Sequence, residues 1–164
     1  MQLKNQVEWA LHCCGVLAAM PEGKSLPAKV LAEFHGVPRE YLAKALQGLS
    51  QAGIVVGTLG PSGGYRLAKR PEEVTFLDVV EAVEGTRATF ACMEIRTKNP
   101  CMTAEEKRCT LERPCAIAKV MWEADEAWRS RLREVRLSDL LETLAREVPT
   151  DVLQKGYDWI LDRC

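Results

Sequence analysis

The stretch HGVPREYLAKALQGLSQAG, residues 35–53, decides the fold. Its apolar side chains recur at i, i+3, i+4 and i+7, the spacing of one helix face, at Leu42, Ala45, Leu46 and Leu49. This periodicity predicts a helix over residues 39–52. Gly36 permits a sharp turn before that helix, Pro38 suits its first turn, and Gly53 suits its end.

A shorter helix precedes this turn, and two strands follow the longer helix. Ser25 is the predicted cap of the shorter helix, whose apolar residues are Val30, Leu31 and Phe34. Residues 54–58 and 65–68 are strand-like, and LGPSGG between them reads as a hairpin tip. Two short helices across a glycine turn, followed by a hairpin, are typical of a winged helix-turn-helix.

The rest of the chain predicts a mainly α protein. Helical spacing covers residues 2–20, and TFLDVVEAVEG at 75–85 reads as a short helix capped by Thr75. Residues 86–114 lose the periodicity and are expected to be mostly loop. Further helices are expected over residues 116–133, from Leu137 with Ser138 as cap, and as a short helix around Trp159. We therefore expect three segments: 1–85, 86–115 and 116–164.

Composition excludes several classes of protein. A chain of 164 residues suits one compact domain or a small domain with an appended helix. No run of 18 apolar residues exists, so no membrane segment is expected, and the first twenty residues lack a signal-peptide layout, which favours the cytoplasm. A P-loop, a Rossmann fingerprint and a Ser-His-Asp arrangement are all missing from the sequence, so catalysis is not expected.

The charge distribution points to double-stranded DNA as a partner. The net charge is -1, yet seven basic residues stand against two acidic ones between Lys24 and Arg70: Lys24, Lys29, Arg39, Lys44, Arg66, Lys69 and Arg70 against Glu33 and Glu40. A winged helix places its second helix in the major groove and its wing on the backbone or minor groove. The candidate contact residues are Arg39, Tyr41, Lys44 and Gln47 on the helix and Ser62, Gly63 and Gly64 in the wing.

Seven cysteines are many for this length, and four of them fall between the wing and the long helix, at Cys92, Cys101, Cys109 and Cys115. In a reducing compartment such residues are more often ligands or redox groups than structural disulfides. The CTLERPC spacing is not the CxxC of zinc ribbons, so zinc is not indicated. A thiol switch without metal, through Cys101–Cys109 or Cys109–Cys115, is one alternative.

GPSGGYRLAKRPEEVTFLDVVEAVEG, the cysteine loop, CAIAKVMWEADEAW and VRLSDLLETL together resemble the IscR/NsrR (Rrf-type) family of bacterial regulators. The resemblance covers nearly the whole chain in order. It implies a homodimeric winged-helix transcriptional regulator, acting as repressor or activator, that senses redox state, nitric oxide or iron supply through an iron–sulfur cluster. It also implies that the long helix after Cys115 is the dimerisation helix.

The resemblance further implies a set of cluster ligands. VEWALHCC, residues 7–14, resembles the RsrR-like subgroup, in which Glu and His of one subunit and two cysteines of the other hold a [2Fe–2S] cluster. In this sequence the corresponding ligands would be Glu8, His12, Cys109 and Cys115. A [4Fe–4S] cluster held by Cys101, Cys109, Cys115 and Glu8 is the alternative. The remaining cysteines are expected to be non-ligands, and Cys13 and Cys14 are expected in the helical core: Cys13, Cys14, Cys92 and Cys164.

Overall fold

The computed structural model describes residues 3–60 and 63–164 and divides into two compact units. One unit combines the chain up to Thr86 with Leu132–Cys164, and the other is Arg87–Arg131. The C-terminal helices thus belong to the same unit as the N-terminal half of the chain. The division of the chain at residues 85 and 115 stays a prediction.

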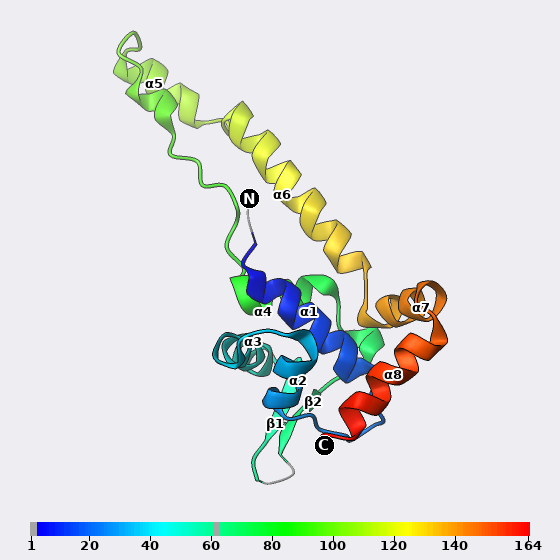
Figure 1. Cartoon of the computed structure of the whole chain (residues 1–164). Coiled ribbons are helices and arrows are strands. Elements are labelled where there is room, and N and C mark those ends of the chain that lie inside the picture. The colour runs from blue at the N-terminus through cyan, green and yellow to red at the C-terminus, as the bar shows by residue number, and fades with distance from the viewer. Residues whose placement is uncertain (1–2, 61–62) are drawn as a thin grey trace. The chain divides into compact units, whose positions relative to one another are not determined.

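The first unit is a winged helix-turn-helix with added helices, as the periodicities predicted (Figure 1). Gly36 has a φ of 63°, the left-handed conformation that the turn before the second helix of the motif requires. The elements in chain order are α1 (Asn5–Ala18), α2 (Ala28–His35), α3 (Arg39–Gln51), β1 (Val55–Thr58), β2 (Gly64–Leu67), the 3-10 helix η1 (Pro71–Glu73), α4 (Phe76–Glu84), α7 (Leu137–Glu147) and α8 (Thr150–Leu161).

Helix α1 lies at the centre of this unit and packs against α3, α4 and α7. Its buried face includes both adjacent cysteines, which confirms their predicted place in the core: Val7, Ala10, Cys13, Cys14 and Leu17. The second helix of the motif contributes the four apolar residues that its periodicity singled out: Leu42, Ala45, Leu46 and Leu49. Burying these side chains is the main favourable contribution to stability in such a helical domain.

The two predicted caps at Ser25 and Ser138 are wrong. Helix α2 is preceded by Pro27, because Leu26 is already engaged in an antiparallel bridge with Tyr65 of the wing, with both N···O distances 2.8 Å. Helix α7 begins one residue before Ser138, because the backbone of Arg136 forms a bridge with Thr75 at the start of α4. In both places a tertiary backbone contact overrides the local capping signal.

The wing is a two-stranded antiparallel hairpin in which Val55 pairs with Leu67 and Thr58 with Gly64. The predicted strand ranges, 54–58 and 65–68, agree with it to within a residue at each end. Gly64 is buried, and a Cβ at this position would collide with the Leu26 backbone. The hairpin is therefore pressed directly onto the segment that leads into α2.

The second unit holds the four cysteines that the sequence placed in a loop. Within it lie the 3-10 helix η2 (Ile95–Lys98), α5 (Ala104–Leu111) and most of α6 (Ala116–Glu134). The expectation of a mostly irregular stretch over 86–114 is wrong at α5. Thr103 and Glu106 form a reciprocal capping box there, the side chain of each accepting from the other's backbone N–H, and this local signal starts the helix.

The Asp125–Arg129 ion pair of α6 also binds residues 87–89 at the start of this unit through hydrogen bonds. Asp125 accepts a hydrogen bond from the Thr89 hydroxyl at 2.8 Å and from Arg129 Nε at 3.1 Å. Arg129 also donates to the Arg87 carbonyl oxygen at 3.0 Å. Because the Arg129 and Asp125 side chains are 12% and 10% exposed, solvent screens this pair less than a surface pair.

None of the helices in residues 3–60 and 63–164 combines the length and the apolar character that crossing a membrane requires.

At Gly48 the backbones of α3 and α4 approach each other closely, and this position yields a test of the packing. A Cβ at Gly48 would lie 2.6 Å from the Ala82 carbonyl oxygen. An alanine in an open helix position usually stabilises relative to glycine, but here we expect Gly48→Ala to lower the free energy of unfolding by about 1–3 kcal/mol. Chemical denaturation measures this, with the exposed Ser50→Ala on the same helix as control. A stabilised Gly48→Ala variant would show that α3 and α4 are not in this close contact.

Candidate functional site

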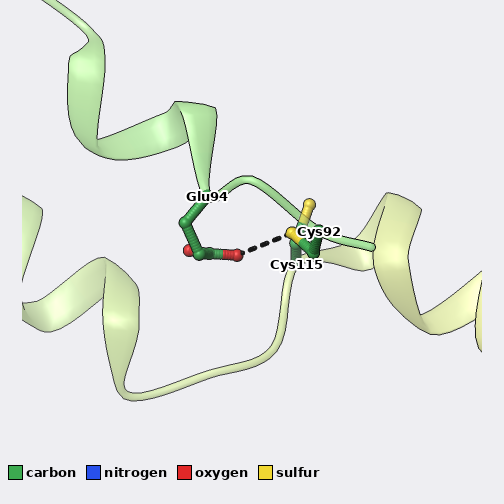
Figure 2. A group of neighbouring side chains, drawn as sticks. All are labelled: Cys92, Glu94 and Cys115. Carbon is green, nitrogen blue, oxygen red and sulfur yellow. Dashed lines mark hydrogen bonds between the residues drawn. The ribbon is translucent and has the colours of Figure 1, made fainter. Parts of the chain in front are cut away.

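Three side chains of the Arg87–Arg131 unit form a compact group of potential metal ligands. The Sγ atoms of Cys92 and Cys115 and a carboxylate oxygen of Glu94 all lie within 4.8 Å of one another (Figure 2). The Cys92 thiol donates a hydrogen bond to Glu94 Oε1 at 3.1 Å. Cys115 directly precedes α6, and its carbonyl oxygen accepts the Lys119 N–H of the first helical turn at 2.9 Å. The two sulfurs therefore come from two separate segments of the chain and lie close together.

Arg96 holds these two segments together. Its Nη2 donates to Glu94 Oε2 at 2.7 Å and to the Arg113 carbonyl oxygen at 3.0 Å. The first bond orients the carboxylate next to Cys92, and the second fixes the backbone two residues before Cys115. A charge-assisted guanidinium contact of this kind is stronger than a neutral hydrogen bond.

The two thiols have opposite electrostatic surroundings. The backbone N–H of Ala118 at the start of α6 donates to Cys115 and, with the Ile117 N–H and the Arg96 charge, lowers the pKa of this thiol below 9.0. For Cys92, the Glu94 backbone N–H acts in the same direction, but the hydrogen bond to the Glu94 carboxylate, desolvation and the carboxylate charge outweigh it. The pKa of Cys92 is therefore raised.

The other loop cysteines lie elsewhere on the unit. Cys109 is on α5 and Cys101 precedes that helix; both are exposed, and neither belongs to the group around Cys115. Cys92 was expected to be a non-ligand; the structure places its thiol in one group with that of Cys115, and its role as ligand or non-ligand stays a prediction. Spacing along an irregular segment does not report which cysteines meet, so the sequence carried no signal for this pair.

Glu8 and His12 lie one turn apart on the exposed side of α1 and both line the same apolar cavity of about 1050 Å³. This cavity lies in the first unit, among α1, α2, α7 and α8, with mainly apolar walls that include Leu11, Phe34, Leu144, Leu153 and Ile160. The structure thus brings Glu8 and His12 together, as the i, i+4 spacing predicted. They belong to one compact unit, and Cys109 and Cys115 belong to the other.

His12 contacts the helix-turn-helix through a second histidine. The ring centroids of His12 and His35 are 5.5 Å apart, and His35 is the last residue of α2, next to the Gly36 turn. Burial and then the neighbouring His12 lower the pKa of His35. Within the described part of the chain, the buried His35 Nε2 has no hydrogen-bond partner. Phe34 packs edge-on against His35 and also against Trp159 of α8.

The four helix residues predicted to contact DNA are all exposed on α3: Arg39, Tyr41, Lys44 and Gln47. They lie opposite the buried apolar residues that fix the helix in the core. Lys44 Nζ lies 5.9 Å from the Tyr41 ring centroid. Two cations, a phenol and an amide on one accessible side supply donors for phosphates and for base edges.

The backbone N–H groups of the wing residues Gly63 and Gly64 form hydrogen bonds within the wing itself. The Gly63 N–H donates to the Gly60 carbonyl oxygen at 2.9 Å, and the Gly64 N–H donates to Thr58 Oγ1 at 3.3 Å. Both N–H groups therefore have partners inside the wing, and contact of Gly63 and Gly64 with phosphate stays a prediction. Ser62 lies outside the described residues.

Comparisons with known proteins identify a family that matches the chain, similar relatives and a solved structure with a similar fold. The family profile for Rrf2, described as iron-dependent transcriptional regulator, matches residues 3–143. The chain is 32% identical over 145 residues to the transcriptional regulator NsrR of Geobacillus kaustophilus, covering 88% of this chain and 92% of that protein. It is 34% identical over 113 residues to the protein rrf2 of Nitratidesulfovibrio vulgaris, covering 69% of each. Among solved structures, IscR of T. potens has a TM-score of 0.66 at 19% identity, over 92% of this chain and 93% of that one.

The opposite surroundings of Cys92 and Cys115 predict different pH profiles of alkylation. Since iodoacetamide reacts with thiolates, the alkylation midpoint of Cys115 should lie at a lower pH than that of an ordinary cysteine, and the midpoint of Cys92 at a higher pH. Peptide mass spectrometry of the iron-free full chain measures both midpoints in one sample. Arg96→Gln removes the nearby cation and should move the Cys115 midpoint upward. Equal midpoints for the two thiols would contradict the geometry.

Proposed function

Because the chain belongs to the Rrf2 family of transcriptional regulators, we propose that it is a homodimer whose affinity for operator DNA depends on the redox state of a [2Fe–2S] cluster held between its subunits. The family establishes a DNA-binding transcriptional regulator rather than an enzyme. We place its action in the bacterial cytoplasm, where operator DNA lies. The observation that carries the cluster is the close approach of the Cys92 thiol to that of Cys115, which directly precedes α6.

The donor chemistry of the two units suits such a cluster. Thiolates are preferred ligands of iron–sulfur clusters, and imidazole replaces thiolate on one iron in Rieske-type centres. We propose that one subunit supplies two cysteines and that the other supplies Glu8 and His12 from α1. Cys115 is common to the sequence-based set and to the group in the structure. Its partner is Cys109 by resemblance and Cys92 by proximity, and the 4.8 Å group favours Cys92.

A bound cluster would supply a one-electron couple; the chain's own residues would carry its state to the DNA-binding surface. Glu8 and His12 lie on the exposed side of α1, whose opposite side packs against α3. His12 also contacts His35, which ends α2 immediately before the turn into α3. A small displacement of α1 would therefore reach the recognition helix by two routes, through the core and through the histidine pair.

The proposal of a dimer rests on exposed apolar side chains on the surface of α6. Several large apolar side chains on the first turns of this helix are exposed: Ile117 (68%), Val120 (63%), Met121 (41%) and Trp122 (44%). A row of this kind on a long helix is typical of a surface that a second subunit covers. A shared interface on α6 would also hold Cys115, which directly precedes it.

A [4Fe–4S] cluster on Cys101, Cys109, Cys115 and Glu8 is the competing proposal. It receives less support, because neither Cys101 nor Cys109 joins the group around Cys115. Iron and sulfide counts separate the two cluster types directly.

Substitution of each candidate ligand tests the site. Anaerobically purified protein should hold about two irons and two sulfides per subunit and give a red, redox-cycling spectrum. Cys115→Ser and His12→Ala should both lose this spectrum, because each removes a ligand, and Cys101→Ser serves as the matched control. Comparing Cys92→Ser with Cys109→Ser decides which thiol partners Cys115. About four irons per subunit and indifference to His12→Ala would move the site to the loop cysteines.

DNA binding offers an independent test of the recognition helix. On a fragment selected from random DNA, affinity should differ by about tenfold or more between the oxidised and the reduced protein. Lys44→Gln should weaken binding in both states and lower the slope of log K against log salt by about 1, since it removes one cation from the interface. Lys155→Gln on α8 removes an exposed cation elsewhere and should change neither value. Equal DNA affinity of the oxidised and the reduced protein would contradict the proposed redox switch.

A further inference from the structure

We propose that Cys92 and Cys115 form an intramolecular disulfide when iron-free protein meets hydrogen peroxide, and that this bond closes the site to iron. The second half of this inference rests on the proposed function, because it requires that these sulfurs bind iron. The first half rests only on the geometry of the Arg87–Arg131 unit. The thiol switches considered from sequence paired Cys109 with Cys101 or with Cys115, and the structure points to a different pair.

The two sulfurs are close, and one of them can move. Both Sγ atoms lie within the 4.8 Å group, whereas a disulfide bond joins sulfurs about 2.0 Å apart. Cys115 is held by its place at the start of α6. Cys92 lies in the stretch 87–94, which contains neither helix nor strand, so its backbone is not fixed by a helical or strand ladder. The gap between the sulfurs can therefore close by movement of Cys92.

No other described cysteine competes on equal terms. Cys13 and Cys14 are fully buried in the core, away from solvent. Cys101, Cys109 and Cys164 are exposed but lie outside the group that contains Cys115. Proximity therefore selects one pair, and the Arg96 contacts to Glu94 and to the Arg113 carbonyl oxygen hold that pair in place.

Hydrogen bonding assigns different roles to the two sulfurs. Among the described residues, the thiol that donates to the Glu94 carboxylate is that of Cys92 and not that of Cys115, so we assign the first attack on peroxide to Cys115. The Cys92 thiol donates to the Glu94 carboxylate, which can accept its proton when that sulfur becomes the second nucleophile. Cys115 is thus the attacking sulfur and Cys92 the resolving one.

The chemistry balances with peroxide as the only co-reactant. The Cys115 sulfur attacks one peroxide oxygen, the O–O bond breaks, and the other oxygen leaves as hydroxide and takes the former Cys115 proton to become water. Cys115 is then a sulfenic acid. The Cys92 sulfur attacks the Cys115 sulfur, the S–O bond breaks, and the departing hydroxide takes the Cys92 proton by way of Glu94. Two thiols and one peroxide give one disulfide and two waters.

The bond would act as a block on iron loading. A sulfur in a disulfide is no longer a thiolate, so both donors that the loop offers would be lost together. A dithiol would restore them by exchange through a mixed disulfide. The protein would then distinguish two oxidative events: a change in the cluster when iron is bound, and closure of the site when it is not.

The test uses the iron-free full chain, one equivalent of hydrogen peroxide per chain, and peptide mapping by mass spectrometry. We expect a chain mass lower by two hydrogens, two fewer alkylatable thiols, and a Cys92–Cys115 cross-linked peptide within one chain. Cys92→Ser should stop at a sulfenic acid on Cys115 that dimedone traps. The double variant Cys101→Ser/Cys109→Ser should form the bond as the wild type does. A bond through Cys101 or Cys109, a bond between chains, or no bond would overturn the inference.

Iron reconstitution separates this inference from the proposed function. The peroxide-treated protein should take up iron about tenfold less than the reduced protein, and dithiothreitol should restore uptake. If the disulfide forms but the reduced protein also takes up no iron, the cluster proposal fails and the disulfide stands. If the reduced protein takes up iron but no Cys92–Cys115 bond forms, the inference fails and the cluster proposal stands. Undiminished iron uptake by disulfide-bonded protein would overturn the block.

Discussion

The packing of α1 into the core is the contact on which the rest of the first unit depends. One side of this helix is buried among α3, α4 and α7, and the opposite side carries Glu8 and His12. A helix that lay loosely on the surface could shift when a ligand bound without moving the elements around it. A helix packed this tightly moves only together with its neighbours, because well-packed interiors transmit strain. The two polar residues are therefore attached, through the helix itself, to the element that would lie in the major groove.

Arg96 has the comparable part in the second unit. The segments 92–94 and 113–115 contain neither helix nor strand, and the guanidinium group links them through a carboxylate and a carbonyl oxygen. Without that link, the entropy of two loop segments would oppose their meeting. The guanidinium charge also contributes to the lowered pKa of Cys115, after the backbone N–H of Ala118, whereas the raised pKa of Cys92 comes from the Glu94 carboxylate and desolvation. Arg96 thus links the two segments, and other groups set most of the difference between the two thiols.

Sequence alone predicted the regular parts of the molecule well and their contacts poorly. The i, i+3, i+4, i+7 spacing gave the recognition helix to within a residue, because its apolar side is set by the core it faces. The caps at Ser25 and Ser138 failed where bridges from Tyr65 and Thr75 decided the helix starts. The pairing of Cys92 with Cys115 depends on a tertiary contact through Arg96, and periodicity contains no information about such a contact.

The seven cysteines also divide by surroundings rather than by spacing. Burial raises the pKa of the Cys13 thiol to about 12 and raises that of Cys14 as well, so neither forms a thiolate readily. These two residues serve as small apolar side chains on the inner face of α1, although they stand next to His12 in the sequence. The close pair Cys92 and Cys115 comes instead from an irregular segment and from the residue directly before α6. Burial and local charge at each sulfur therefore distinguish the core cysteines from the others better than position in the sequence does.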